Sequence, residues 1–380
     1  MTGVLRNQVG ASRSQITLRS AEDASRWLGI LSENPEGPGI VHGLHVSGVE
    51  SFPSLLTWPK LESLHHLGLR GIDFRDPHEP LTPFLNAYSS SVDELVLEGL
   101  RFREAEELFA LIIPFKNLNS LVIHDVEWGN GELLDDDEAG SGSESESEDE
   151  THKHTMQPGD CCSIAIAGLH LVDDVGVDLP TLKHLSLRGC SSTITRCFAR
   201  MPSKLCLSRL EISWEDEHLL PLGEMIEACA PSLSELSISG VSHTECDYPL
   251  SLSSCTQLSS LYLNGVHLFL DEPLGPALHH LASTLPTPEA SKHPRFINVC
   301  FTLDMGPAWA SRIDNVDWDA VAVSLASLES RLDNNKDNWV VAMKVDSSYL
   351  PISGEEERQI LDVAGQKLER FSAVLRLDIH

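Results

Sequence analysis

The sequence lacks the short motifs that mark the common classes of nucleotide-binding and hydrolytic enzymes. It contains no phosphate-cradling GxxxxGK[ST], no dinucleotide-binding GxGxxG, no zinc-protease HExxH and no serine-hydrolase GxSxG. Its histidines stand without a placed nucleophile or a pair of carboxylates beside them in a recognisable pattern. The sequence therefore predicts a protein that is not an enzyme and that needs no cofactor and no metal.

Basic and aromatic residues are both scarce. The chain has 27 Lys and Arg against 57 Asp and Glu, a formal net charge of −30, and only 6% aromatic residues. Such a field repels phosphate backbones and anionic membrane surfaces, and nucleic-acid surfaces combine cations with stacking rings. This composition argues against nucleic-acid and membrane partners and favours a protein ligand.

Long apolar runs and glycosylation signals are missing too. The longest apolar stretch, Leu108 to Phe115, is too short to cross a bilayer. The first twenty residues contain no apolar core of a signal peptide, and no Asn-x-Ser/Thr occurs. The nine cysteines are an odd number and none precedes Cys161. We expect a monomer in a reducing compartment, the cytoplasm or the nucleus.

A repeating frame of apolar residues is what the sequence does contain. In the stretch LKHLSLRGC, apolar residues stand at Leu182, Leu185, Leu187 and Cys190, with Gly189 before the last of them. If Leu185 is numbered zero, the apolar positions are −3, 0, +2 and +5, and glycine is at +4. The same apolar positions recur with the zero position at Leu44, Leu67, Leu95, Leu121, Ile164, Leu210, Leu236 and Leu261, with Glu215 as the one polar exception, and seven of the nine copies have glycine at +4.

The frame predicts a strand followed by a turn in each copy. Side chains alternate along a strand, so positions 0 and +2 point inward and −1, +1 and +3 point outward. Glycine at +4 allows a positive φ. The shorter intervals, 21 to 28 residues, match leucine-rich repeats, in which parallel strands line the inside of an arc and helices its outside. Helical return segments are predicted at 81–88, 103–113, 194–201, 219–230 and 274–284, after a first strand at 15–18 and a helix at 20–32.

The predicted organisation has three parts. Residues 1–14 form a disordered N-terminus, residues 15–290 an α/β leucine-rich-repeat solenoid, and residues 291–380 an α/β cap on its C-terminal end. In this last part the frame fails, although apolar runs at 296–303, 339–345 and 374–379 predict strands, and 316–332 and 354–371 predict helices. A separate small domain from about Pro288 onward is the alternative.

An acidic tract interrupts the frame between Leu121 and Ile164, an interval of 43 residues. The tract, Glu132 to Glu150, has no Lys, Arg, aromatic or β-branched residue, which predicts a disordered insert at about 129–160. Glu follows each tract serine three residues on, a spacing that acid-directed kinases favour. The candidate phosphorylation sites are Ser141, Ser143, Ser145 and Ser147.

Segments such as LESLHHLGLRGI, LKHLSLRGC and LSELSISGV resemble leucine-rich repeats of the cysteine-containing kind. Irregular arrays of this sort are similar to the substrate-recognition part of fungal F-box proteins. The resemblance implies a non-catalytic module that presents a protein substrate to a ubiquitin ligase. That family carries an F-box, a short helical segment opening with Leu-Pro, near its N-terminus, and no such segment is recognisable in this sequence.

The outward strand positions are the candidate binding residues, since ligands of curved repeats sit on the concave face. We expect a protein-binding surface in which Arg and Tyr supply the anchors. The candidates are Arg70, Glu98, His184, Arg188, Arg209, Glu211 and Tyr262. The alternative function is that of an acidic, histone-chaperone-like binder of basic proteins, acting through the Glu132–Glu150 tract.

One group of potential metal ligands lies just after the acidic tract. His152, His154, Cys161 and Cys162 lie close together, but their spacing matches no Cys/His zinc pattern. Two adjacent cysteines in a strand would also point to opposite faces. The sequence therefore predicts no metal site here.

Overall fold

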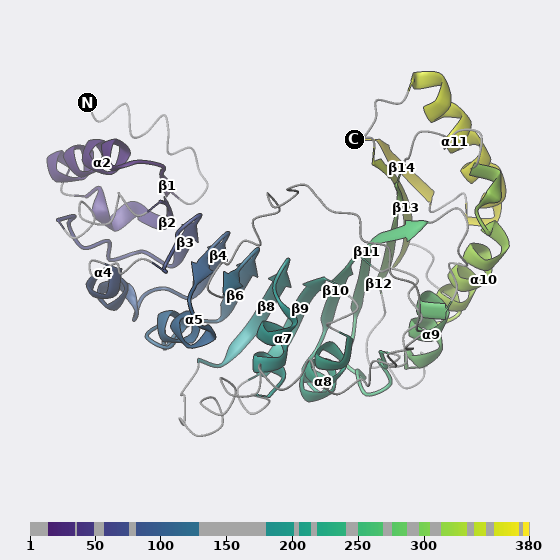
Figure 1. Cartoon of the computed structure of the whole chain (residues 1–380), viewed down its shortest axis with the longest axis horizontal. Coiled ribbons are helices and arrows are strands. Elements are labelled where there is room, and N and C mark those ends of the chain that lie inside the picture. Colours follow the sequence, from purple (N-terminus) through teal and green to yellow (C-terminus); the bar gives the residue numbers. More distant parts are fainter. Residues whose placement is uncertain are drawn as a thin grey trace, which may run out of the picture.

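A computed structural model of the chain shows an open arc of strands and helices (Figure 1). The structure describes residues 14–34, 36–48, 57–75, 81–128, 180–200, 205–213, 219–240, 250–268, 276–286, 296–304, 313–332, 338–346, 353–371 and 375–379. The N-terminal segment before residue 14 and the acidic tract lie outside these ranges, so the predictions of disorder there stay predictions.

A single parallel sheet of twelve strands runs from one end of the arc to the other. The order is β1-β2-β3-β4-β6-β8-β9-β10-β11-β12-β13-β14, and every pairing in it is parallel. The strands are β1 (Ser14–Leu18), β2 (Val41–Ser47), β3 (His66–Arg70), β4 (Glu94–Glu98), β6 (Ser120–His124), β8 (Leu182–Arg188), β9 (Leu205–Ser213), β10 (Glu235–Ser239), β11 (Ser260–Leu268), β12 (Phe296–Asp304), β13 (Trp339–Asp346) and β14 (Leu375–Ile379). A separate two-stranded sheet pairs β5 (Arg101–Phe102) with β7 (Glu127–Trp128).

Helices connect the strands along the outer side of the arc, while the sheet lines its inner side (Figure 1). They are α2 (Ala21–Glu33), α4 (Leu81–Tyr88), α5 (Ala105–Ile112), α7 (Ser192–Ala199), α8 (Leu219–Cys229), α9 (Pro276–Thr284), α10 (Trp318–Glu329) and α11 (Gly354–Lys367), with short 3₁₀ turns η1 (Pro38–Ile40), η6 (Ile313–Asn315) and η8 (Glu369–Phe371). The helices expected from the sequence are confirmed within a few residues at their ends. None of the helices in the described ranges is long and apolar enough to span a membrane.

The apolar frame builds the core between the sheet and the helices. Leu185 and Leu187 of β8 are 0% and 1% exposed, and Leu182 at the −3 position is 2% exposed. The neighbouring strands are aligned residue for residue, with Leu121 beside Leu185 and Leu210 next in the row. Stacked copies therefore share one continuous apolar layer, which a single strand and helix could not bury alone.

The +4 glycines turn the chain out of each strand. Gly189 has φ +56°, and the other described +4 glycines also lie in the left-handed region. Asp125 occupies the same position after β6 and takes φ 51°, as the one described non-glycine residue with positive φ. Asp tolerates this region better than most residues, so the same turn forms at Asp125 without glycine.

The copy of the frame predicted at Ile164 would place a strand between β6 and β8. Ile164 lies outside the described residues, but β6 and β8 pair with each other directly, Ser120 with His184 through His124 with Arg188. The order of the described strands thus leaves no position for a strand between the Leu121 and Leu185 copies. The prediction of an intervening repeat was wrong on this point.

The sheet continues past the point where the frame fails. β12 pairs with β11 over eight residue positions, and β13 and β14 follow in parallel. Ile297 and Val299 of β12 are fully buried, as are the 0 and +2 residues of the earlier strands. The three C-terminal strands therefore extend the same sheet, and β12 and β13 also continue the same core.

Candidate functional site

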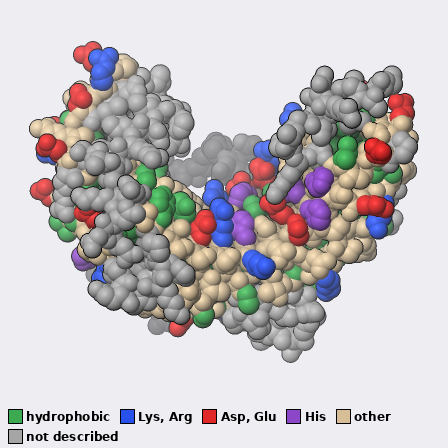
Figure 2. All heavy atoms as spheres, turned by 180° about the vertical axis from the view of Figure 1, so that it is seen from behind, with side chains coloured by type: hydrophobic (Ala, Val, Ile, Leu, Met, Phe, Trp, Pro, Cys, Tyr) green, Lys and Arg blue, Asp and Glu red, His purple; other side chains and the backbone are tan. Residues whose placement is uncertain are grey.

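The inner face of the sheet carries three rows of side chains, at positions −1, +1 and +3 of each strand. Because the strands are in register, residues at the same position lie side by side: His184 beside Arg209 in the −1 row, and Ser186 beside Glu211 in the +1 row. We call this surface, from β2 to β12, the concave face. Cationic, anionic and histidine side chains gather in the hollow of the arc (Figure 2).

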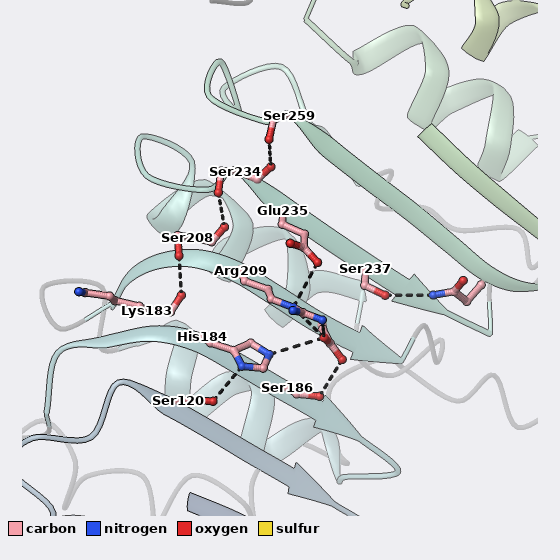
Figure 3. Close-up of polar contacts among 12 residues, drawn as sticks. Ser120, Lys183, His184, Ser186, Ser208, Arg209, Ser234, Glu235, Ser237 and Ser259 are labelled. Carbon is pink, nitrogen blue, oxygen red and sulfur yellow. Dashed lines mark hydrogen bonds and ion pairs between the residues drawn. The ribbon is translucent and has the colours of Figure 1, made fainter. Parts of the chain in front are cut away.

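A carboxylate at the middle of the concave face is surrounded by hydrogen-bond donors (Figure 3). Arg188 Nη2 donates to Glu211 Oε2 at 2.8 Å, and Arg209 Nε donates to Glu211 Oε1 at 2.9 Å. Ser186 Oγ donates to Oε2 at 3.3 Å. The Glu211 side chain is 12% exposed, whereas the two arginine side chains are 44% and 47% exposed. The buried carboxylate thus holds two half-exposed guanidinium groups. We call these four residues the Glu211 cluster.

Two histidines complete this arrangement. His184 Nε2 lies 3.6 Å from Glu211 Oε1, within ion-pair range but beyond a hydrogen bond, and Ser120 Oγ lies 2.9 Å from His184 Nδ1. His124 Nε2 lies 3.1 Å from Ser186 Oγ. Since the single Ser186 hydroxyl proton goes to Glu211, His124 must donate from Nε2 to the serine oxygen. The cluster is therefore tied to β6 as well as to β8 and β9.

The surroundings keep Glu211 ionised. His184 beside the carboxylate, the Arg209 hydrogen bonds and the Arg188 charge together lower the pKa of Glu211 to about 2, against the opposing effect of burial. For His124, burial and the Arg188 charge lower the pKa of the imidazole. At neutral pH the Glu211 cluster accordingly contains one carboxylate, two guanidinium groups and a neutral His124 at its edge.

The N-terminal part of the concave face is built from separate pairs. Arg70 Nη2 lies 3.2 Å from Glu98 Oε1, and His66 Nδ1 lies 2.9 Å from Glu94 Oε2. The His45 ring packs on His66 with ring centroids 4.6 Å apart. Burial and the neighbouring His66 lower the pKa of His45. The charges of this part largely neutralise one another.

The C-terminal part of the concave face carries no charged side chain among the described residues of the three rows from β11 to β12. Tyr262 on β11 and Phe296 on β12 form a partly exposed aromatic pair with ring centroids 5.7 Å apart. Asn298 stands next to Tyr262 in the +1 row, and its buried Oδ1 atom has no hydrogen-bond partner among the described residues. Asn264 Nδ2 donates to Ser237 Oγ at 3.1 Å. This part of the face combines an aromatic pair with uncharged polar side chains.

Serine side chains form a ladder of hydrogen bonds between neighbouring strands, at the position just before the −1 row (Figure 3). Ser208 donates to the Lys183 carbonyl, Ser234 to the Ser208 carbonyl and Ser259 to the Ser234 carbonyl, at 3.2, 2.8 and 2.9 Å. Each hydroxyl bonds the equivalent residue of the preceding strand. The ladder holds the rows at a fixed spacing, which pre-organises the side chains of the concave face.

The structure brings together four of the seven residues proposed from the sequence: His184, Arg188, Arg209 and Glu211. Arg70 and Glu98 form their own pair on β3 and β4, and Tyr262 lies toward the C-terminal end. The contributions of Ser120, His124 and Ser186 were missed, since serines at outward positions carry no sequence signal of their own. The +1 and +3 positions of neighbouring copies could have placed His124 and Ser186 beside Glu211.

One expectation about these positions was wrong. Position +1 of the frame predicts Ser186 as an outward, solvated residue, but it is 1% exposed. The long side chains of Arg188, Glu211 and His124 close over it, and its hydroxyl connects two of them. An outward position on a concave sheet can thus be buried by its neighbours in the rows.

Ser186→Ala is expected to lower the free energy of unfolding by about 1–3 kcal/mol, because Glu211 loses a buried donor and His124 loses its acceptor. Ser260→Ala is the control, since Ser260 lies in the −1 row and shows no side-chain hydrogen bond. We expect the control to change stability by at most about 0.5 kcal/mol. Urea unfolding of both variants is the measurement, and equal effects would contradict the buried position of Ser186.

The Ser120, His184 and Glu211 series differs in geometry from a hydrolase triad. A triad needs a hydrogen bond from the imidazole to the carboxylate and free backbone N–H groups for the oxyanion. The His184–Glu211 distance is 3.6 Å, and Glu211 is already engaged by two arginines. Ser120 lies within β6, whose backbone is paired with β4 and β8 in the sheet.

Metal-ligand groupings were sought over the described part of the chain, and no set of three His, Cys, Asp or Glu side chains there is placed to hold an ion. Burial raises the pKa of Cys197 and Cys255 to about 11 and of Cys229 to about 12, which makes these thiols poor ligands and nucleophiles. His152, His154, Cys161, Cys162 and the four tract serines lie outside the described residues.

No protein-family model matches the chain, and no curated protein matches it.

Proposed function

We propose that the chain is a non-catalytic protein-binding module whose concave face recognises a protein ligand. The observation that carries the proposal is the Glu211 cluster, in which a carboxylate with a 12% exposed side chain fixes two guanidinium groups that are about half exposed. A buried acid that orders exposed arginines pre-organises them and reduces the entropy lost on binding. Arginine and tyrosine are also the residues that most often dominate protein interfaces.

The repeat type and the cellular role belong to the same proposal. The −3, 0, +2, +5 frame with glycine at +4 and the long parallel sheet support a leucine-rich-repeat solenoid, similar to the recognition part of fungal F-box proteins. In that role the chain is a cytoplasmic or nuclear monomer that selects substrates for a ubiquitin ligase. Recovery of ligase components with the chain would support this role, even though the sequence carries no recognisable F-box.

Photo-cross-linking from two positions tests the use of the concave face. A photoreactive amino acid at Ser260 should capture the protein ligand in cells, because the residue lies in the −1 row of the concave face, beside Glu235. The matched control is the same amino acid at Val323, which is 61% exposed on outer helix α10. Equal capture from both positions, or capture from Val323 alone, contradicts the proposal.

Deletion of Glu132–Glu150 separates this proposal from the histone-chaperone-like alternative. Binding through the concave face should survive the deletion, whereas binding of basic proteins through the acidic tract should be lost. Loss of all Ser260 cross-links in the deletion variant favours the tract.

A further inference from the structure

We propose that the concave face binds an extended acidic peptide segment of a partner protein, with one carboxylate on Arg188 and an aromatic or large aliphatic side chain on the Tyr262–Phe296 pair. This inference rests on the proposed function and names the chemistry of the ligand. The two subsites lie on the same face of one sheet, on β8 and on β11 with β12. The Arg188 subsite is charged and binds a carboxylate, whereas the Tyr262–Phe296 subsite is apolar and binds an aromatic or large aliphatic side chain.

Arg188 is the anion subsite because its guanidinium is only partly used. Among the described residues it makes one side-chain hydrogen bond, from Nη2 to Glu211 Oε2, and its side chain is 44% exposed. The remaining N–H groups of the planar fork match a carboxylate in bidentate geometry. Arg209, by contrast, is shared between Glu211 and Glu235, whose Oε1 lies 3.2 Å from Arg209 Nε. Arg188 therefore offers the stronger unfilled site for an anion.

Glu211 is a positioning residue in this arrangement. Its ionised carboxylate fixes the Arg188 side chain from beneath, with Ser186 bonded to the same oxygen. Glu235 also pairs with Arg209, so the charge of Arg209 is taken up within the face, and the half-exposed Arg188 is the cation that remains open to a ligand. An acidic ligand gains from the N–H groups of Arg188 that point away from Glu211 and from the rigid placement of this side chain.

The Tyr262–Phe296 pair provides the apolar subsite. Both rings are partly exposed, and their centroids are 5.7 Å apart, so a third apolar side chain can pack on the pair. Asn298 lies beside Tyr262 with a buried Oδ1 atom that has no hydrogen-bond partner among the described residues. This buried atom is out of reach of a ligand on the face, so the subsite consists of the two exposed ring surfaces.

The spacing between the subsites sets the length of the motif. Three strand-to-strand steps separate β8 from β11, and at about 4.8 Å each they span roughly 14 Å. Arg188 in the +3 row and Tyr262 in the +1 row are also offset by two residues along the strands, about 7 Å, so roughly 16 Å separates them. An extended peptide covers about 3.4 Å per residue, so about five residues span this distance, and side chains four or six positions apart point to the same side. The ligand motif is thus an acidic residue and an aromatic or large aliphatic residue with three to five residues between them.

A basic ligand fits this face less well. The exposed carboxylates of the N-terminal part are already paired, Glu98 with Arg70 and Glu94 with His66. A lysine placed at Arg188 would meet a like charge and N–H donors, with no acceptor for its own N–H groups. Selection from a random peptide library can enrich either acidic or basic peptides, so it tests this preference.

Selection from a display library of random short peptides on the intact chain tests the inference. We expect enrichment of peptides with an acidic and an aromatic or large aliphatic residue at that spacing. Arg188→Gln should weaken the selected peptide about 10-fold or more. Replacing the peptide's acidic residue by its amide should cost the same, and the two changes should not add. Phe296→Ala should weaken binding when the acidic residue is intact. Arg26→Gln, on exposed outer helix α2, is the matched control and should change nothing.

The possible failures are distinguishable, provided that the variants keep the thermal unfolding midpoint of the parent chain. Enriched peptides that are basic or lack the acidic and apolar pair, yet lose binding with Phe296→Ala, overturn the inference and leave the proposed function standing. Peptides that bind equally to the parent chain, Arg188→Gln and Phe296→Ala overturn both, and so does the absence of any enriched peptide.

Discussion

Leu185→Ala is expected to lower the free energy of unfolding by about 2–5 kcal/mol. Leu185 is fully buried at the zero position of β8, between Leu121 and Leu210 of the adjacent strands. Its truncation removes apolar contacts and leaves a cavity in a layer that every neighbouring unit shares. Urea unfolding followed by circular dichroism measures the effect.

Lys183→Ala on the same strand is the control for this experiment. Lys183 is exposed and lies two residues before Leu185. We expect its truncation to change stability by at most about 0.5 kcal/mol. Comparable losses for both variants would mean that the apolar frame does not form the core. A loss confined to Leu185→Ala supports the inward and outward assignment of the whole frame.

The strands could be predicted from the sequence because two strong local signals agree in most copies. Period-two alternation separates the faces, and glycine at +4 ends the strand with a positive φ, as at Gly189. Asp125 shows the limit of this signal, because the left-handed turn forms there without glycine. The fold depends on a positive φ at the +4 position, and glycine is the residue that most often adopts it in this chain.

Long-range pairing was harder to predict than strand identity. A short apolar pattern such as the one at Ile164 matches the frame by composition alone, whereas membership in the sheet depends on which strands pair. β6 and β8 pair directly across a long insertion, because closing a longer loop costs little additional entropy. Conversely, β12 lacks the frame yet extends the sheet, because its buried Ile297 and Val299 continue the apolar layer.

The candidate site could be predicted only in part, for a physical reason. The rows of outward residues follow from periodicity, so Arg188, Arg209 and Glu211 could be named in advance. Which of them interact depends on side-chain length and direction across strands. Ser186 is short, so longer neighbours close over it and convert an outward position into a buried one. No local pattern of residues carries that information.

Glu211→Gln is expected to lower the free energy of unfolding at pH 7 by roughly 3 kcal/mol, because the pKa of Glu211 falls from its ordinary value of 4.5 to about 2 in the folded chain. The amide has no charge to balance Arg188 and Arg209, and it presents N–H groups to the donors around it. Glu224→Gln, at an exposed position on α8, is the control and should stay within about 0.5 kcal/mol.

The same variant tests the pH dependence of this contribution. A carboxylate with a lowered folded-state pKa stabilises the protein fully above its ordinary pKa, and that stabilisation is lost as the pH falls from about 5 toward 2. The difference in unfolding free energy between the parent chain and Glu211→Gln should therefore be constant from pH 7 to about 5 and shrink below that. Urea unfolding across this range measures it. A difference that stays the same down to pH 3 would mean that Glu211 contributes through shape and packing, and that its charge does not hold the two arginines in place.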